Sequence, residues 1–447
     1  MFRAFVRAAV VAAGVWVAFV PAVAASIQAP SPSDREVWIT IEDTVFAAVT
    51  GVFEAGPGAE VLPFLPRLAE TRGVVLSALP ESALESLSQR IHRDFLRCGG
   101  FVKHESLAEA REALARLERR SQPSAPLVLP FAIDRPTVVA PLVAAIDEAA
   151  ILATITSLST NFANRYHAHA TGTNAANAIK AQWEGYAAGH EGVTVELYSH
   201  AGITPQPSVV ATIPGTTLPG QIVIVGAHED SIRSGCSGNP TCTAPGADDD
   251  ASGVATISEA LRVLLASGVR PQRTIQFMAY AAEEVGLDGS DDIAGDYAAA
   301  AKQVVAVLQQ DMTAYQGSVT DVTLIQDTAY TNSELNQFLG AIVDTYLPAL
   351  TRGTSNCGYG CSDHASWNVR GYPAAMAFEA PYPGSYNTAL HTPQDTVATF
   401  GGTAAHAAKF ARIAVAFALE AALDWTPDIF ADGFESANLE SWSNSVP

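Results

Sequence analysis

The chain has 447 residues, of which 48% are hydrophobic and 16% are charged, and its formal net charge is −21. The composition is that of a globular protein, and the length allows two or three structural units at about 150 residues per domain. The acidity argues against nucleic acid and anionic membranes as partners, because both repel a negative surface. We attribute the charge to solubility outside a cell.

Residues 1–24 have the features of a secretory signal peptide. Arg3 and Arg7 precede a short apolar run, and the small residues Ala22-Val23-Ala24 follow it. The apolar run is shorter than the roughly 20 residues that a membrane span needs, so a membrane anchor is the weaker alternative. We therefore expect a secreted protein, either extracellular or periplasmic.

Residues 25–135 differ in composition from the rest, because they hold almost half of the chain's 25 lysines and arginines. Two charged, amphipathic helices are expected over 81–96 and 106–120. A proline-rich loop over 121–136 follows and offers exposed sites for proteolysis. We interpret 25–135 as a propeptide that binds the rest of the chain. An accessory domain that is kept and only assists folding is the alternative.

Residues 136–425 alternate between expected strands and expected helices. The expected strands are 221–225, 274–279, 304–309 and 322–325. The expected helices are 149–162, 174–187, 254–266, 333–346 and 403–423. This alternation predicts an α/β fold with a mixed, mostly parallel central sheet sandwiched by helices. The remaining residues, 426–447, form a short acidic tail that we expect to be peripheral.

Four of the five cysteines form two close pairs in the sequence. The short separations favour Cys236–Cys242 and Cys357–Cys361 among the three possible connectivities, and a secreted chain favours disulfides. Zinc binding by these thiols is the alternative, although CGYGC lacks the usual two-residue spacing. Cys98 stands alone, and we expect it to be free or removed with the propeptide.

Metal-binding residue types follow three of the expected strands. His228 follows the first strand, Glu283 and Glu284 follow the second, and Asp311 follows the third. Since ligands bind outside the carboxyl ends of the strands in such sheets, we expect these side chains to meet at one edge.

Two further residues complete the candidate metal site, namely Asp249 at the start of a helix and His391 in a late loop. Histidine and carboxylate ligands suit zinc, and a pair of zinc ions needs one bridging carboxylate and two terminal ligands for each metal. The five candidates are His228, Asp249, Glu284, Asp311 and His391. Each could separately be a helix cap or a loop residue, but five such coincidences at sheet ends are improbable. Glu283 remains free to act as a general base.

Seven motifs occur along residues 138–424 in the order GAHEDS, APGADDDASG, FMAYAAEEVGLDGS, LQQDMTAY, CGYGCSDHASW, GYPAAMAFE and LHTPQDT. In this order they resemble the secreted bacterial leucyl aminopeptidases of the co-catalytic di-zinc exopeptidase family. Glu229 stands where that family usually has leucine, which affects only local packing.

The resemblance implies a zinc exopeptidase fold with a small N-terminal pro-region and two zinc ions per chain. Asp249 would bridge the two zinc ions. His228 and Glu284 would complete one metal site, and Asp311 and His391 would complete the other.

The resemblance also implies that Glu283 is the catalytic base and acid. Asp230 would hydrogen-bond His228 and set its tautomer. The peptide bond between Asp249 and Asp250 is expected to be cis in this family. His364 is expected to have a structural or supporting role.

An apolar pocket for the first side chain of the substrate is implied as well, and it predicts a leucine-like preference. Its lining residues would be Met312, Ile325, Tyr359, Met376, Phe378, Tyr382, Tyr386 and Leu390. The expected partners are the chain's own propeptide and peptide substrates whose free amine lies near a zinc ion. We expect a monomer.

Glutaminyl cyclases, carboxypeptidases and non-catalytic binding proteins share this fold and are the alternatives. A cyclase is expected to hold one zinc ion. A carboxypeptidase needs a cation for the substrate carboxylate, and Arg370 is the only arginine close to the matched pocket motifs. A binding protein would have lost a ligand or the base, whereas all six positions are filled.

Overall fold

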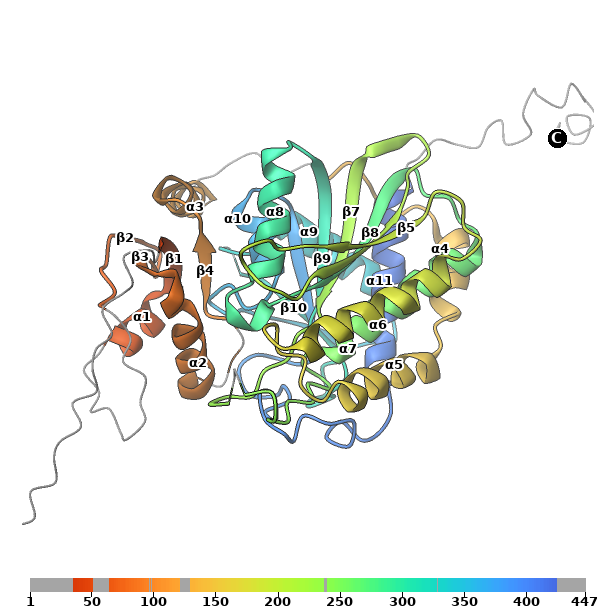
Figure 1. Cartoon of the computed structure of the whole chain (residues 1–447). Coiled ribbons are helices and arrows are strands. Elements are labelled where there is room, and N and C mark those ends of the chain that lie inside the picture. Colours follow the sequence, from red (N-terminus) through yellow and green to blue (C-terminus); the bar gives the residue numbers. More distant parts are fainter. Residues whose placement is uncertain are drawn as a thin grey trace, which may run out of the picture.

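The computed structural model describes most of the chain, and Figure 1 shows its helices and strands. The described residues are 35–50, 64–95, 97, 99–120, 129–236, 239–327 and 329–423. The expected signal peptide, Cys98 and the expected tail over 426–447 lie outside them. Within the described residues the strands form two sheets, one of four strands and one of eight.

The four-stranded sheet belongs to the N-terminal unit, which we define as the described residues between 35 and 120. Its strand order is β2-β3-β1-β4, and every pairing is antiparallel. Alternate residues of β1 (Val37, Ile39 and Ile41) are buried against α1 and α2, as expected for a strand with one face on a core. The elements are β1 (Glu36–Glu42), α1 (Asp43–Thr50), β2 (Ala69–Thr71), β3 (Val74–Pro80), η1 (Glu81–Ala83), α2 (Leu84–Phe95), β4 (Phe101–His104) and α3 (Leu107–Arg120). The sequence predicted α2 and α3 but none of these strands.

The eight-stranded sheet has the order β11-β10-β12-β9-β7-β8-β6-β5. Its four central strands, β12, β9, β7 and β8, are parallel, while β5, β6 and β10 run antiparallel to a neighbour. The strands are β5 (Thr194–Tyr198), β6 (Ser208–Ile213), β7 (Leu218–His228), β8 (Arg273–Tyr280), β9 (Gln303–Gln310), β10 (Val322–Ile325), β11 (Arg352–Ser355) and β12 (Ala374–Phe378). The predicted mixed, mostly parallel sheet is confirmed.

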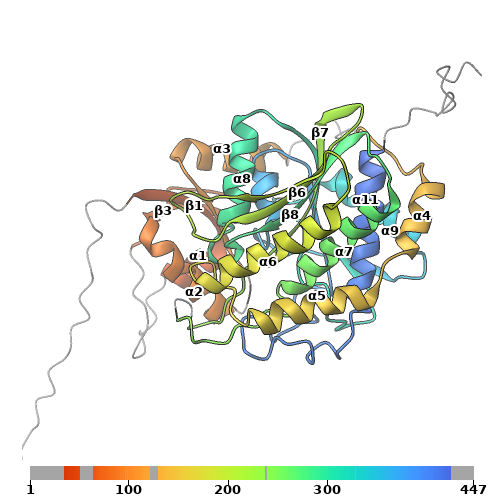
Figure 2. The ribbon, with the colours of Figure 1, turned by 45° about the vertical axis from the view of Figure 1, so that its right-hand side comes forward.

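Helices cover both faces of the eight-stranded sheet, which explains why β7 is apolar at consecutive positions. Val223 and Val225 belong to the core shared with α4, α5, α6, α7, α9 and α11. Ile222 and Ile224 belong to the core shared with α8 and α10 on the other face. The helices are α4 (Pro136–Ala144), α5 (Glu148–Asn161), α6 (Ala170–Ala187), α7 (Ala251–Ser267), α8 (Asp288–Ala299), α9 (Ser333–Tyr346), α10 (His364–Val369) and α11 (Ala407–Ala422). Figure 2 shows α5, α6 and α7 side by side across one face.

The start of α7 places the triple-aspartate motif beside the sheet edge. The side chain of Asp250 accepts a hydrogen bond from the backbone N–H of Gly253 at 2.8 Å, so Asp250 is the N-cap of this helix. Asp249 therefore lies one residue before the N-cap and two residues before the first residue of the helix.

Among the described helices, none is by itself long and apolar enough to cross a membrane, and only α4 and α5, bent by 59°, meet that criterion as a pair.

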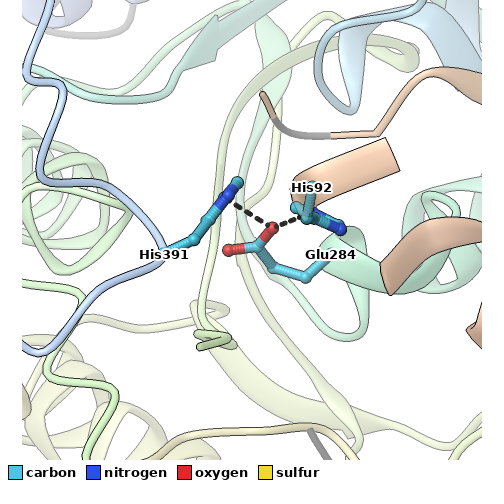
Figure 3. Close-up of side chains that lie close together, drawn as sticks. All are labelled: His92, Glu284 and His391. Carbon is cyan, nitrogen blue, oxygen red and sulfur yellow. Dashed lines mark hydrogen bonds and ion pairs between the residues drawn. The ribbon is translucent and has the colours of Figure 1, made fainter. Parts of the chain in front are cut away.

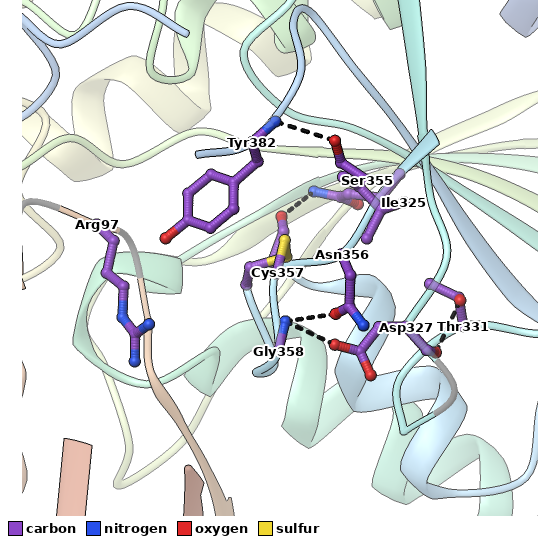
Figure 4. Close-up of a disulfide and its surroundings, with 12 residues drawn as sticks. Arg97, Ile325, Asp327, Thr331, Ser355, Asn356, Cys357, Gly358 and Tyr382 are labelled. Atoms are coloured by element: carbon purple, nitrogen blue, oxygen red, sulfur yellow. Dashed lines mark hydrogen bonds between the residues drawn. A yellow bond between two sulfur atoms is a disulfide. The ribbon is translucent and has the colours of Figure 1, made fainter. Parts of the chain in front are cut away.

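Both expected cysteine pairs are joined in the structure. The Cα atoms of Cys236 and Cys242 are 6.3 Å apart, and those of Cys357 and Cys361 are 6.2 Å apart. The second disulfide lies in the loop beyond β11, close to Tyr382 (Figure 4).

Candidate active site

Three neighbouring strands bring candidate metal ligands to one edge of the sheet. β7 ends at His228, β9 is followed directly by Asp311, and β8 leads into η2 (Glu283–Val285). Because β8, β7 and β9 are parallel neighbours, their carboxyl ends share this edge. The side chains are buried, with at most 2% of each residue exposed. The gathering of these residues, predicted from the sequence, is confirmed.

Asp249 lies between the two histidines and presents one carboxylate oxygen to each. Its Oδ1 atom is 3.0 Å from Nε2 of His228, and its Oδ2 atom is 3.0 Å from Nε2 of His391. This position is the one that a bridging ligand occupies.

The terminal candidates group differently from the expectation. Oδ1 of Asp311 is 3.7 Å from Nε2 of His228, while Oε2 of Glu284 is 3.1 Å from Nε2 of His391. The distances favour His228 with Asp311 and Glu284 with His391 over the expected pairing of His228 with Glu284 and of Asp311 with His391, although donor atoms of His228, Glu283 and Glu284 also lie within 4.8 Å of one another. Both β9 and β8 neighbour β7, but Asp311 follows β9 directly, whereas Glu284 lies in η2, beyond the end of β8.

The chemistry of this cluster fits divalent metal ions. Within the described residues, Oε1 of Glu284 and Oδ1 of Asp311 have no hydrogen-bond partner, although both atoms are buried. Buried carboxylates need a compensating charge, and imidazole with carboxylate donors is a set that zinc accepts. Several of these side chains also lie close enough together to share one ion, with donor atoms within 4.8 Å of one another.

Asp230 connects the first histidine to the adjacent glutamates. Its Oδ1 atom is 3.3 Å from Nδ1 of His228 and accepts the backbone N–H of Glu283 at 3.0 Å. Its Oδ2 atom accepts the backbone N–H of Glu284 at 3.2 Å. Asp230 therefore contacts His228, but Nδ1 of His228 makes no hydrogen bond among the described residues, so the expected hydrogen bond stays a prediction. The contacts with the glutamate backbone are an addition to the expectation.

Glu283 has the surroundings expected of a catalytic base. It is fully buried, and its two carboxyl oxygens have no hydrogen-bond partner among the described residues. Burial raises the pKa of Glu283 well above its ordinary value, while His228 opposes that rise. A raised pKa suits a group that must accept and later return a proton near neutral pH.

Asp395, which the sequence analysis missed, holds the triple-aspartate loop in place. Its carboxylate accepts the backbone N–H of Asp248 at 3.1 Å and that of Asp249 at 3.0 Å. Asn387 donates to both Asp248 and Asp395 and links the two carboxylates. The peptide bond between Asp249 and Asp250 is cis, as expected. Asp395 lies in the same sequence motif as His391, four residues later, and this position could have identified it from the sequence.

All eight residues expected to bind the substrate side chain come together in one apolar cluster. Seven of them line a cavity with Asp311 and both cysteines of the second disulfide, while Ile325 is in the cluster but does not line the cavity. Arg97 of the N-terminal unit lines the same cavity and lies close to the disulfide and Tyr382 in Figure 4.

His92 of α2 was also not expected in the site. Its Nε2 atom is 2.9 Å from Oε2 of Glu284, and its ring meets that of His391 edge-on with 4.4 Å between the ring centres. Figure 3 shows Glu284 between the two histidines. The available signal was two polar residues, Ser88 and His92, on the face of α2 that also carries buried Leu87.

Two residues of the matched motifs lie outside the groups of candidate ligands. Burial lowers the pKa of His364 to about 3, which favours the neutral ring, and neither ring nitrogen has a hydrogen-bond partner in the described part of the chain. Glu229 is buried next to Asp230, and burial raises the pKa of its carboxyl well above the ordinary value.

An α/β fold with buried histidines and carboxylates at its strand ends is an arrangement that suits a metal-dependent enzyme. The model of peptidase family M28 matches residues 208–417. The chain is 41% identical to a "Probable leucine aminopeptidase" of Arthroderma otae, over 59% of this chain and 70% of the relative. It is 39% identical to "Leucine aminopeptidase 1" of Coccidioides posadasii, over 59% of this chain and 68% of the relative. The chain belongs to peptidase family M28.

Two crystal structures from Legionella pneumophila are also similar. The LapA aminopeptidase is 28% identical with a TM-score of 0.71, and the match covers 88% of this chain and 100% of LapA. LapB is 26% identical with the same TM-score, and the match covers 87% of this chain and 100% of LapB. The expected class of enzyme, a zinc-dependent aminopeptidase, is confirmed by the family and these relatives.

Proposed function

We propose that the chain is a secreted aminopeptidase that holds two zinc ions and removes an N-terminal, preferably leucine-like residue from peptides. The observation that carries the proposal is the position of Asp249 between two histidines, each grouped with a further carboxylate. His228 and Asp311 would hold one zinc ion, Glu284 and His391 would hold the other, and Asp249 would bridge them.

Zinc bound by these residues would lower the pKa of water to about 7 and polarise the scissile carbonyl. Glu283 would take the proton from that water and return it to the leaving amine. Asp230 accepts the backbone N–H of Glu283 and would orient His228 through Nδ1, which lies 3.3 Å away. The burial of Glu283 excludes bulk water from the proton transfer.

The pocket supports selection of a large hydrophobic first residue. Its lining is mostly aromatic and apolar, and it adjoins Asp311. A leucine side chain in the pocket would therefore leave the scissile bond beside the candidate ligands. The buried carboxylates around the site favour a substrate with a positive free amine over one with a negative terminus.

The environment of Arg370 speaks against a carboxypeptidase. Its guanidinium makes ion pairs with Asp291 and with Glu109, the latter at 3.0 Å, and its side chain is only 7% exposed. It therefore does not line the apolar pocket, and among the described lining residues the only cation is Arg97 of the N-terminal unit. A zinc count of one would favour the cyclase.

We also propose that residues 25–135 are a propeptide that restrains the enzyme until it is cut away. The contacts of His92 and Arg97 within the site support this role. Leucine p-nitroanilide turnover should rise after limited proteolysis in the loop 121–136, with the new N-terminus sequenced. Equal turnover before and after the cut at saturating zinc would exclude restraint and leave an accessory domain.

Elemental analysis combined with activity tests the zinc proposal. The processed protein should contain two zinc ions per chain, lose turnover of leucine p-nitroanilide after chelation, and regain it when zinc is added. One tightly bound metal ion per chain at saturation would contradict the proposed pair of zinc ions.

A further inference from the structure

We propose that His92 is itself a zinc ligand in the uncut chain. It would bind the ion that Glu284 and His391 hold together with the bridging Asp249, which gives that ion four protein donors. This inference rests on the proposed function and goes beyond it, because it makes the N-terminal unit a part of the metal site.

The distances between the donor atoms carry the first step. Nε2 of His92 is 2.9 Å from Oε2 of Glu284, and this oxygen is 3.1 Å from Nε2 of His391. Nitrogen and oxygen ligands lie roughly 2.0–2.2 Å from zinc, so neighbouring donors on a tetrahedral ion are roughly 3.3 Å apart. The three side chains therefore converge as donors to one ion do, and they lie within 4.8 Å of one another.

The hydrogen bonds of Ser88 determine which nitrogen of His92 faces the site. The hydroxyl of Ser88 donates to the backbone carbonyl of Glu284 at 2.5 Å, so its proton is already used. Nδ1 of His92 lies 2.7 Å from the backbone carbonyl of Ser88, which can only accept. Nδ1 therefore carries a proton, and Nε2 is the nitrogen that faces Glu284 and is available to a metal ion.

Metal-binding histidines commonly donate from their second nitrogen to a carbonyl, as Nδ1 of His92 does here. Nε2 of His92 lies 2.9 Å from Oε2 of Glu284. This contact fits either a second ring proton that donates to Glu284 or a zinc ion shared by a neutral ring, and a measurement of zinc binding decides between them.

The same segment also borders the substrate pocket. Five residues after His92, the guanidinium of Arg97 lies 3.8 Å above the ring of Tyr359, and Arg97 is only 8% exposed. Arg97 lines the cavity together with the apolar residues expected to bind the substrate side chain. The N-terminal unit thus contributes one residue beside the candidate metal ligands and another to the wall of the substrate pocket.

Four protein donors leave no open position on an ion, whereas catalytic zinc needs one for water or substrate. Removal of the N-terminal unit would take away His92 and open that position. The N-terminal unit would then restrain the enzyme by coordinating its metal ion, and not only by blocking access to the site.

Zinc affinity of the uncut chain tests the inference without relying on activity. His92→Asn should weaken the binding of one of the two zinc ions by at least about tenfold in chelator competition. Even residues that only hydrogen-bond a metal ligand contribute that much to metal affinity. His104→Asn is the matched control, because His104 is another buried histidine of the N-terminal unit that instead contacts Thr40 at 3.0 Å. Unchanged affinity for both zinc ions in a folded His92→Asn protein would overturn the inference.

X-ray absorption at the zinc edge of the wild-type chain is a second test, and it needs no variant that could fail to fold. The uncut chain should show three imidazole nitrogens per pair of zinc ions, and the cut chain with its N-terminal unit removed should show two. The same count in both states would also overturn the inference. If two zinc ions bind and the cut chain is nevertheless inactive on leucine p-nitroanilide, the proposed function fails and the role of His92 stands.

Discussion

Asp230 accepts the backbone N–H of Glu283 at 3.0 Å with the same oxygen that lies 3.3 Å from Nδ1 of His228. One carboxylate therefore positions both the proposed base and a proposed metal ligand. A substitution at Asp230 should therefore act on proton transfer and on metal binding together.

We expect Asp230→Asn to lower kcat/KM by about 10–100-fold and to weaken zinc binding, because the amide cannot replace both oxygens as acceptors. Steady-state kinetics with chelator competition measures both effects. Asp344→Asn is the control, since Asp344 is exposed and pairs with Arg352 on the surface. Wild-type zinc affinity and kcat/KM in Asp230→Asn would contradict the positioning role.

Glu283 and Glu284 are adjacent but should respond differently to alanine. Glu283→Ala should keep both zinc ions and lose about 10²–10⁴-fold in kcat, the contribution typical of general base catalysis. Glu284→Ala should lose one zinc ion, because it removes a donor next to His391. Metal analysis and turnover of the two variants decide the assignment, and nearly full activity in Glu283→Ala would reverse it.

The apolar pocket should rank substrates by the size of their first side chain. Each buried methylene contributes about 0.8 kcal/mol, which corresponds to about fourfold in kcat/KM when the whole gain appears in the transition state. Leucine p-nitroanilide should therefore exceed alanine p-nitroanilide, and arginine p-nitroanilide should be poor. A preference of the processed chain for arginine would contradict the assignment of the pocket.

Peptide mapping without reduction should recover linked peptides at Cys236–Cys242 and at Cys357–Cys361. The Cα–Cα distances of both pairs are in the range found for disulfides, and the second pair borders the substrate pocket. Cys98 should be found as a free thiol in the uncut chain. A link between Cys98 and any of the four other cysteines would refute this pairing.

The catalytic region was predictable because its signals are local and redundant. The central parallel strands are mostly apolar, with Gln276 as a polar residue inside β8, and His228, Glu284 and Asp311 each follow an apolar run directly or within a few residues. Parallel topology then brings these positions together whatever the details of packing. The expected strand over 322–325 and the expected helix over 333–346 match β10 and α9 residue for residue.

The contacts that the sequence did not reveal are long-range. The grouping of Glu284 with His391 depends on how η2 and a late loop approach each other, and no spacing in the sequence encodes that distance. His92 reaches the site only because the N-terminal unit folds and docks as a body, with Lys103 pairing with Asp288 at 3.0 Å. Three strands of that unit, β1, β2 and β4, mix polar and apolar residues, whereas β3 is a mostly apolar run that was not expected as a strand.

Turnover of leucine p-nitroanilide and of N-acetyl-leucine p-nitroanilide by the processed, zinc-saturated chain tests the central claim most directly. The two substrates share the scissile bond and the side chain and differ only in the free amine that an aminopeptidase requires. The account predicts turnover of the free amine substrate, its loss after zinc removal, and no turnover of the acetylated one. Equal turnover of both substrates, or turnover that survives zinc removal, would contradict it.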